Sequence, residues 1–318
     1  MIGLAAVAAT VIMHERRLLA LLPLGAVGLV VSLTFVYFSA PDLALTQLLV
    51  EVATIILMML ALHWLPAESA PGTRGSPARC TRDAIVAIAA GGGVAWLAWS
   101  VLKLPVESIS PYFLETTKSL GGGTNAVNVI IVDYRGFDTM GEITVMGVAA
   151  LIIHGLLSDW RPAEAPALPT RPGDTHPLML ALVARLLLPL AAMVSLYLFL
   201  RGHNLPGGGF IAGLVLAIAL VMQFVGSGRE FVAQRMSMDF HVWIGWGLLI
   251  AGATGIGSWF VGAPFLTSTY DYPIWPLVGE VPLASASLFD LGVYLTVVGS
   301  TMVALIGLAR LSATEPPR

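Results

Sequence analysis

Charged residues and cysteine are both scarce in this sequence, and each shortage limits what the protein can be. Asp, Glu, Lys and Arg make up only 11% of the 318 residues, which is too little charge for a water-soluble globular protein. The single cysteine, Cys80, excludes an intrachain disulfide and a multi-cysteine metal or cluster site. The net charge of -3, without any Lys/Arg tract, argues against nucleic acid as a partner, because phosphate binding requires clustered cations. We therefore expect no cofactor held by this chain and no nucleic-acid contact.

Apolar residues are abundant instead and indicate an all-α integral membrane protein. They make up 57% of the chain, and the mean hydropathy is +0.85. A spanning helix needs about 20 apolar residues, so this content predicts about nine spans and no large extramembrane head. The first is short, because thirteen residues rise only about 20 Å in a core about 30 Å thick. The expected helices cover residues 1–13, 18–39, 42–65, 84–103, 140–157, 178–200, 207–226, 240–262 and 288–310.

The distribution of cations predicts the orientation of these helices. With the N-terminus outside, eleven Lys and Arg residues fall in inner loops and four fall in outer loops. The positive-inside rule then favours an outer N-terminus and an inner C-terminus. Two segments rich in proline and small residues are expected to be inner-side linkers. These linkers, residues 66–82 and 161–177, divide the chain into sections 1–65, 83–160 and 178–318.

Glu51 is the clearest candidate for an ion or proton pathway. It lies about nine residues into the third expected span, and thus near the membrane midplane. Gln47 and Thr54 fall on the same helix face, which makes a polar stripe. Ionisable groups at this depth are costly and usually serve transport. The alternative is that Glu51 only forms a hydrogen bond with a neighbouring helix.

A second candidate cluster comprises Arg135, Asp138 and Glu142, which share one face if the segment is helical. A helix continuous through this region would be too long to cross the membrane once, so Gly136 or Gly141 is expected to mark a break. An ion pair near the outer surface, with Glu142 one turn deeper, would suit collection of cations or protons. The alternative for the ion pair is an interfacial anchor.

A glycine-rich segment between the sixth and seventh expected spans is a structural motif. Its glycines permit unusual backbone angles and close helix approach, but it lacks the Gly-Lys-Ser/Thr ending of a phosphate loop. The motif residues are Arg201, His203, Asn204, Pro206, Gly207, Gly208 and Gly209.

The remaining ionisable residues give weaker indications. Arg185, inside the sixth span, is expected to extend to the interface or to pair with a carboxylate. Asp290 and Asp239 are expected to be solvated or capping residues at helix ends. The histidines, His241 among them, lack metal-ligand spacing, so no metal site is expected. Nucleophile and paired-carboxylate patterns of enzymes are missing from the sequence, which argues against an enzyme.

Three motifs of the chain resemble those of Mrp-type multisubunit cation/proton antiporters. APDLALTQLLVEV (40–52) and NVIIVDYRGFDTMGEI (128–143) are similar to the C-terminal membrane region of the large A subunit, and RGHNLPGGGFIAG (201–213) is similar to the B-subunit signature. The chain thus resembles an A-subunit tail fused to a B subunit, without the long antiporter-like part of the A subunit. By position, Glu51 and Glu142 match acidic residues of the family motifs.

The resemblance implies a subunit of a Na+ (or K+)/H+ antiporter in the bacterial cytoplasmic membrane. It implies other membrane subunits as partners, including an antiporter-like large subunit, together with lipid, and it implies that the chain does not transport alone. Two alternatives stay open, namely a membrane-arm subunit of a redox-driven ion pump and a mainly structural scaffold. The candidate pathway residues are Glu51, Glu142, Asp138, Gln47, Thr54 and Arg185.

Overall fold

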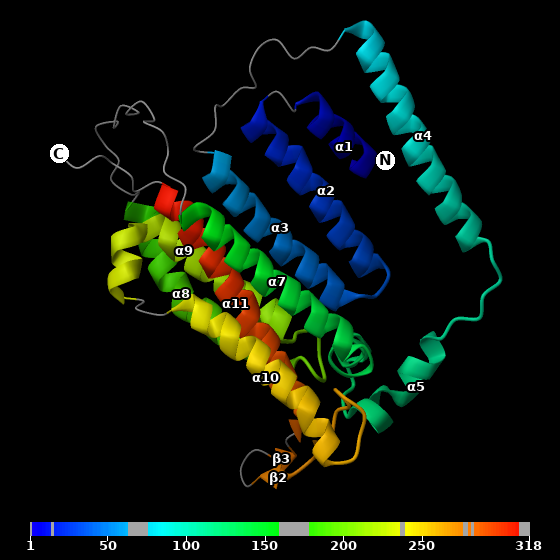
Figure 1. Ribbon diagram of the computed structural model, residues 1–318, viewed down its shortest axis with the longest axis vertical. Helices are drawn as coiled ribbons and strands as arrows, with labels where there is room; N and C mark the ends of the chain where they lie inside the picture. The colour runs from blue at the N-terminus through cyan, green and yellow to red at the C-terminus, as the bar shows by residue number, and fades with distance from the viewer. Residues whose placement is uncertain are drawn as a thin grey trace.

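The protein is a bundle of apolar helices (Figure 1). The computed structural model describes residues 2–13, 16–62, 76–158, 178–235, 239–275, 279–280 and 283–311. The helices are α1 (Ile2–Ile12), α2 (Arg17–Tyr37), α3 (Pro41–Leu62), α4 (Pro77–Leu102), α5 (Ser110–Gly121), α6 (Ala126–Val129), the π-helix η1 (Ile130–Tyr134), α7 (Gly136–Ser158), α8 (Leu178–Arg201), α9 (Gly209–Arg235), α10 (Phe240–Phe260) and α11 (Ser285–Leu311). Within these residues, eight helices are long and apolar enough to cross a membrane. The first expected span, α1, is a shorter apolar helix, and the expected count and orientation stay predictions.

The start of α4 corrects one expected boundary. This helix begins at Pro77, earlier than the expected residue 84, so the end of the expected linker 66–82 is helical. Pro77 suits a first helical position, because its missing N–H needs no partner there. The Ser76 side chain caps the helix by accepting a hydrogen bond from the Arg79 N–H at 3.4 Å. The expected linker 161–177 lies outside the described residues.

The expected break before the fifth span is confirmed at Gly136. The chain forms η1, leaves helical geometry at Arg135 and starts α7 at Gly136. The Thr139 hydroxyl donates to the Ile131 carbonyl at 2.7 Å, which satisfies a backbone acceptor left open by the break. Helix α7 is therefore longer than the expected 140–157 and is separated from the segment that precedes it.

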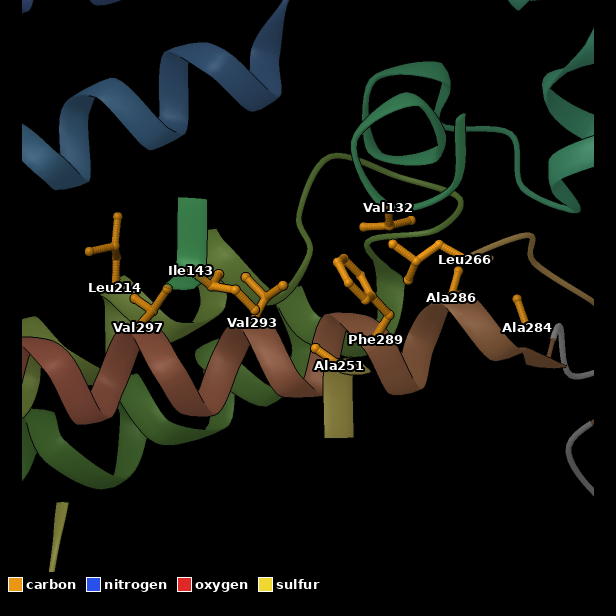
Figure 2. Close-up of a cluster of buried hydrophobic side chains, with 10 residues drawn as sticks. All are labelled: Val132, Ile143, Leu214, Ala251, Leu266, Ala284, Ala286, Phe289, Val293 and Val297. Carbon is orange, nitrogen blue, oxygen red and sulfur yellow. The ribbon is translucent and has the colours of Figure 1, made fainter. Parts of the chain in front are cut away.

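The core forms where α7, α9 and α10 pack against α11, and it extends toward η1 (Figure 2). Phe289, Val293 and Val297 of α11 are almost fully buried there. Helices α10 and α11 cross so closely that a Cβ on Gly292 would lie 2.5 Å from the Gly247 carbonyl oxygen. Small residues permit this approach between membrane helices.

The other elements lie around this core. Helices α1–α3 pack in sequence, and α3 contacts α9, whereas α4 stands apart (Figure 1). Two antiparallel strand pairs, which the all-α prediction did not include, lie between α10 and α11. They are β1 (Tyr270–Asp271) with β4 (Leu283–Ala284), and β2 (Ile274–Trp275) with β3 (Gly279–Glu280).

Candidate functional site

A cavity of about 310 Å³ lies where the first turns of α3, α7 and α9 meet the early part of α11. We call this end of the bundle the cavity end. The aligned peptide groups of a helix give its N-terminus a partial positive charge, so convergence of several such termini favours acidic side chains. Four carboxylates line the cavity, from Asp42, Asp138, Glu142 and Asp290.

Asp290 lies at a buried position of the cavity wall. Its exposure is only 7%, and its carboxylate accepts the Gly209 N–H at 2.7 Å and a hydrogen bond from the Asn128 side chain. A buried carboxylate is costly unless hydrogen-bonded, and these two donors meet that requirement. The expectation that Asp290 is solvated is therefore wrong, whereas a capping role is present at the start of α9, whose first residue is Gly209, and not at the start of its own helix.

Asp42 occupies a similar position on the other side of the glycine-rich segment. It is 5% exposed and accepts the Gly207 N–H at 2.7 Å. The positive charge of Arg201 also acts on Asp42. Two carboxylates from distant parts of the chain thus bind neighbouring backbone groups of one loop.

The loop itself depends on glycine geometry. Gly208 has φ +105°, and a Cβ there would lie 2.5 Å from the Asn128 amide nitrogen. The Arg201 guanidinium donates to the Pro206 carbonyl at 2.7 Å, a hydrogen bond between the two ends of the turn that precedes the glycines. The predicted motif is therefore a tightly packed backbone segment that presents N–H groups to carboxylates.

Residues just before α6 hold the loop from outside. The Thr124 hydroxyl donates to the Asn204 carbonyl at 2.8 Å. The Asn125 amide donates to the carbonyls of Gly202 and Leu205 at 3.0 and 3.1 Å. These contacts join section 178–318 to section 83–160.

His203 and Asp133 lie outside the spanning helices, where burial changes their protonation. Burial lowers the pKa of His203, although its hydrogen bond with the Gly121 carbonyl and the nearby charge of Asp133 act in the opposite direction. The ring nitrogen Nε2 lies 2.9 Å from that carbonyl oxygen, so Nε2 carries a proton. Burial raises the pKa of Asp133, against the hydrogen bond that its carboxylate accepts from the Ser268 N–H.

The second sequence cluster lies at the cavity wall. Arg135 and Asp138 form the expected ion pair, and the Arg135 Nε lies 2.6 Å from the Asp138 carboxylate. Glu142 lines the same cavity one turn further along α7 and is exposed in this chain. The prediction that these three residues share a face is confirmed.

Glu51 lies away from the cavity. Its half-buried side chain packs against α2, where a Cβ on Gly28 would overlap the carboxylate oxygen Oε2. Gln47 is half-buried and Thr54 is exposed. Arg185 is exposed on α8 and does not line the cavity.

Asp42, Asn128 and Asp290 were missed as site residues because their roles depend on long-range partners. Asp42 and Asn128 both lie in the quoted motifs, which was the one available signal. Asp290 had no such signal, since its partner Gly209 is far away in sequence. In the described parts of the chain, no group of three or more His, Cys, Asp or Glu side chains is placed to hold a metal ion.

The helices and the cavity define a class, a multi-pass integral membrane protein with ionisable groups inside its bundle. Three family models match successive parts of the chain. The MbhD family of MBH matches residues 2–67, the MbhE family of MBH matches 78–171, and the family described as a domain related to the MnhB subunit of Na+/H+ antiporter matches 179–303. The chain belongs to the Mrp-type antiporter family and combines an A-subunit tail with a B subunit.

Individual relatives agree with this assignment. The probable K+/H+ antiporter A/B subunit of Rhizobium meliloti (strain 1021) is 44% identical over 95% of this chain and 33% of its own length. The Na+/H+ antiporter B subunit of Bacillus subtilis (strain 168) is 44% identical over 40% of this chain and 90% of its own length. A chain of the Mrp complex structure from Dietzia sp. DQ12-45-1b is 34% identical, with a TM-score of 0.86 over 99% of this chain and 35% of that one. This chain therefore spans about one third of the length of the A/B relative. Its apolar helices and its antiporter relatives identify it as a multi-pass protein of the bacterial cytoplasmic membrane.

Proposed function

We propose that this chain is a membrane subunit of a multisubunit Na+ (or K+)/H+ antiporter, to which it contributes a proton and cation pathway. Its activity is secondary transport and not enzymatic turnover. Its partners are other membrane subunits, including an antiporter-like large subunit, together with lipid. Under the predicted orientation the cavity opens toward the outer side.

The cavity carboxylates are the observation that supports this proposal most. Asp290 is held by a backbone N–H and an amide, which are neutral donors that stabilise the carboxylate without cancelling its charge. Such a group inside a membrane protein attracts a proton or a small cation. Asp138 and Glu142 line the same cavity and extend the acidic surface.

Replacement of Asp290 by Asn tests the proposal. Asp290→Asn keeps an oxygen that can accept the Gly209 N–H but removes the charge. We expect the assembled complex in vesicles to lose cation-dependent proton movement by about a hundredfold or more, the usual scale for a lost proton-transfer group. The control is Asp271→Asn, at an exposed aspartate of β1. Equal transport in the two variants would exclude Asp290 from the pathway.

Glu51 and Glu142 are proposed as further pathway residues, assisted by Gln47 and Thr54 beside Glu51. Asp138 and Arg185 are proposed to adjust the local charge. Glu51→Gln and Glu142→Gln should each reduce transport in vesicles without loss of assembly. Undiminished transport when both glutamates are neutralised would favour the structural scaffold.

A redox-driven ion pump is the second candidate, because two of the matching family models carry MBH names. A membrane arm of that kind would purify with metal-containing soluble subunits. A partner set made only of membrane proteins favours the antiporter.

A further inference from the structure

A second cluster of titratable groups lies at the opposite end of the bundle. It comprises His154 on α7 with Asp239 and His241 at the start of α10. His154 lies eighteen positions after Gly136 on α7, a rise of about 27 Å. The cluster is therefore distinct from the cavity and lies near the other membrane face.

The hydrogen bonds of His241 determine which ring nitrogen carries its proton. Nδ1 lies 3.0 Å from the Asp239 carboxylate oxygen Oδ1, which also accepts the His241 backbone N–H and so caps α10. The hydrogen bond from the His241 ring lowers the pKa of the exposed Asp239, so this carboxylate is ionised near neutral pH. Because a carboxylate only accepts, Nδ1 must donate. In the neutral ring, Nε2 is then left as a proton acceptor.

The two nitrogens of His241 face different environments. The Asp239 side chain bonded to Nδ1 is 65% exposed. Nε2 is buried and has no hydrogen-bond partner within the described residues. The ring of His154 lies beside it, with centroids 4.4 Å apart at an interplanar angle of 75°. Nδ1 is thus hydrogen-bonded to a water-exposed carboxylate, whereas Nε2 faces the protein interior.

The described parts of the helices packed against α10 carry few other ionisable residues near this pair. Among the helices packed against α10, α7 carries no ionisable residue other than His154 between 143 and 157, and α11 carries none between 297 and 307. The next charged position on α11 is Arg310, whose side chain lies outside the described part.

We infer that His241 passes protons between the bundle interior and the water at this end, with His154 as the inner carrier. A proton from His154 binds the lone pair of Nε2, and the proton on Nδ1 leaves to Asp239 and then to water. The ring is neutral before and after, and a rotation of the ring that exchanges the positions of its two nitrogens restores the starting arrangement. The inference rests on the proposed antiport function and supplies the exchange site opposite the cavity.

His241→Asn is the decisive variant. The Asn amide can donate to Asp239 in place of Nδ1, but it has no second nitrogen that relays a proton. In assembled complexes in vesicles we expect transport to fall about tenfold or more, with unchanged recovery of the complex. His154→Gln, which lies outside the helix cap, should give the same loss, and it decides the question if His241→Asn fails to assemble. Asp239→Ser keeps the cap and should give a smaller loss with a shifted pH profile.

Chemical rescue separates a relay from a structural role. Added imidazole should restore part of the transport of His241→Ala, because a free ring can carry the proton, whereas packing defects should not respond. Full transport and an unchanged pH profile in both histidine variants, alongside a defective Asp290→Asn variant, would overturn this inference and leave the proposed function intact. Absence of cation-dependent proton movement in the wild-type complex would overturn the proposed function itself.

Discussion

Gly208 shows how strongly one residue constrains the site. Its φ of +105° is unfavourable for any side chain, and an added Cβ would press on the Asn128 amide. We expect Gly208→Ala to lower the free energy of unfolding by about 1–3 kcal/mol, as measured by thermal unfolding in detergent. Gly245→Ala is the matched control, because a Cβ on this helical glycine meets nothing within 4 Å. A Gly208→Ala chain as stable as that control would show that the loop does not require this backbone angle.

Gly28 provides a test of Glu51 that keeps its carboxyl group but changes the position of that group. A Cβ at Gly28 would overlap Oε2, Cδ and Cγ of Glu51, so the whole side chain beyond its Cβ must move away. We expect Gly28→Ala to reduce transport toward the level of Glu51→Gln, with a change in unfolding free energy below about 1 kcal/mol. Transport is measured in vesicles, with Gly257→Ala as the control at an unobstructed glycine. Normal transport in Gly28→Ala would show that the position of Glu51 against α2 is unimportant.

The loop between α8 and α9 should make stability depend on pH through His203. Burial lowers the pKa of this ring in the folded protein below its ordinary value of 6.5. The unfolded chain therefore binds more protons as pH falls below about 6.5, and stability should fall with it. Unfolding temperatures measured between pH 5 and 8 should show this acid-side loss in the wild type and little of it in His203→Gln.

Asp133 gives a control of opposite sign for the same measurement. Burial raises the pKa of Asp133 above its ordinary value of 3.8, so the folded protein binds more protons than the unfolded chain above that pH. Its contribution to stability therefore decreases as pH rises through the folded pKa. Asp133→Asn should gain stability relative to the wild type as pH rises, and parallel pH profiles for the two variants would contradict both assignments.

Most helices were predictable because a spanning helix is a local property of the sequence. Long apolar runs located the centres of α2, α8, α10 and α11 to within a few residues. The early start of α4 was missed because composition outweighed the Pro77 helix-start signal. The π-helix η1 and the short strands were not predictable, since they depend on contacts such as that between Asp133 and Ser268.

For the molecule as a whole, sequence identified the elements of the site but not their assembly. The Arg135–Asp138 pair and the glycine loop were recognised from local spacing. They line one cavity with Asp42 and Asp290 only because the early turns of four helices meet in space. His154 and His241 likewise come into contact although they are far apart in the sequence. Composition and periodicity therefore did not predict the contacts between distant segments that assemble the site.

These same contacts predict that the chain can be divided. Expressed as separate polypeptides, residues 1–160 and 178–318 should purify together from membranes, because Thr124, Asn125 and Asp42 bind the loop of the second section directly. Asn125→Ala removes two hydrogen bonds to that loop, each worth on the order of 1 kcal/mol net, so recovery of the divided pair should fall about tenfold or more.

In the undivided chain the same substitution should have a smaller effect, since covalent connection keeps the sections at a high effective concentration. Thr254→Val, which removes a hydroxyl that bonds the Ile250 carbonyl within α10, serves as the control and should leave recovery unchanged. If the two polypeptides do not purify together at all, the covalent connection and not the loop interface holds the sections in place.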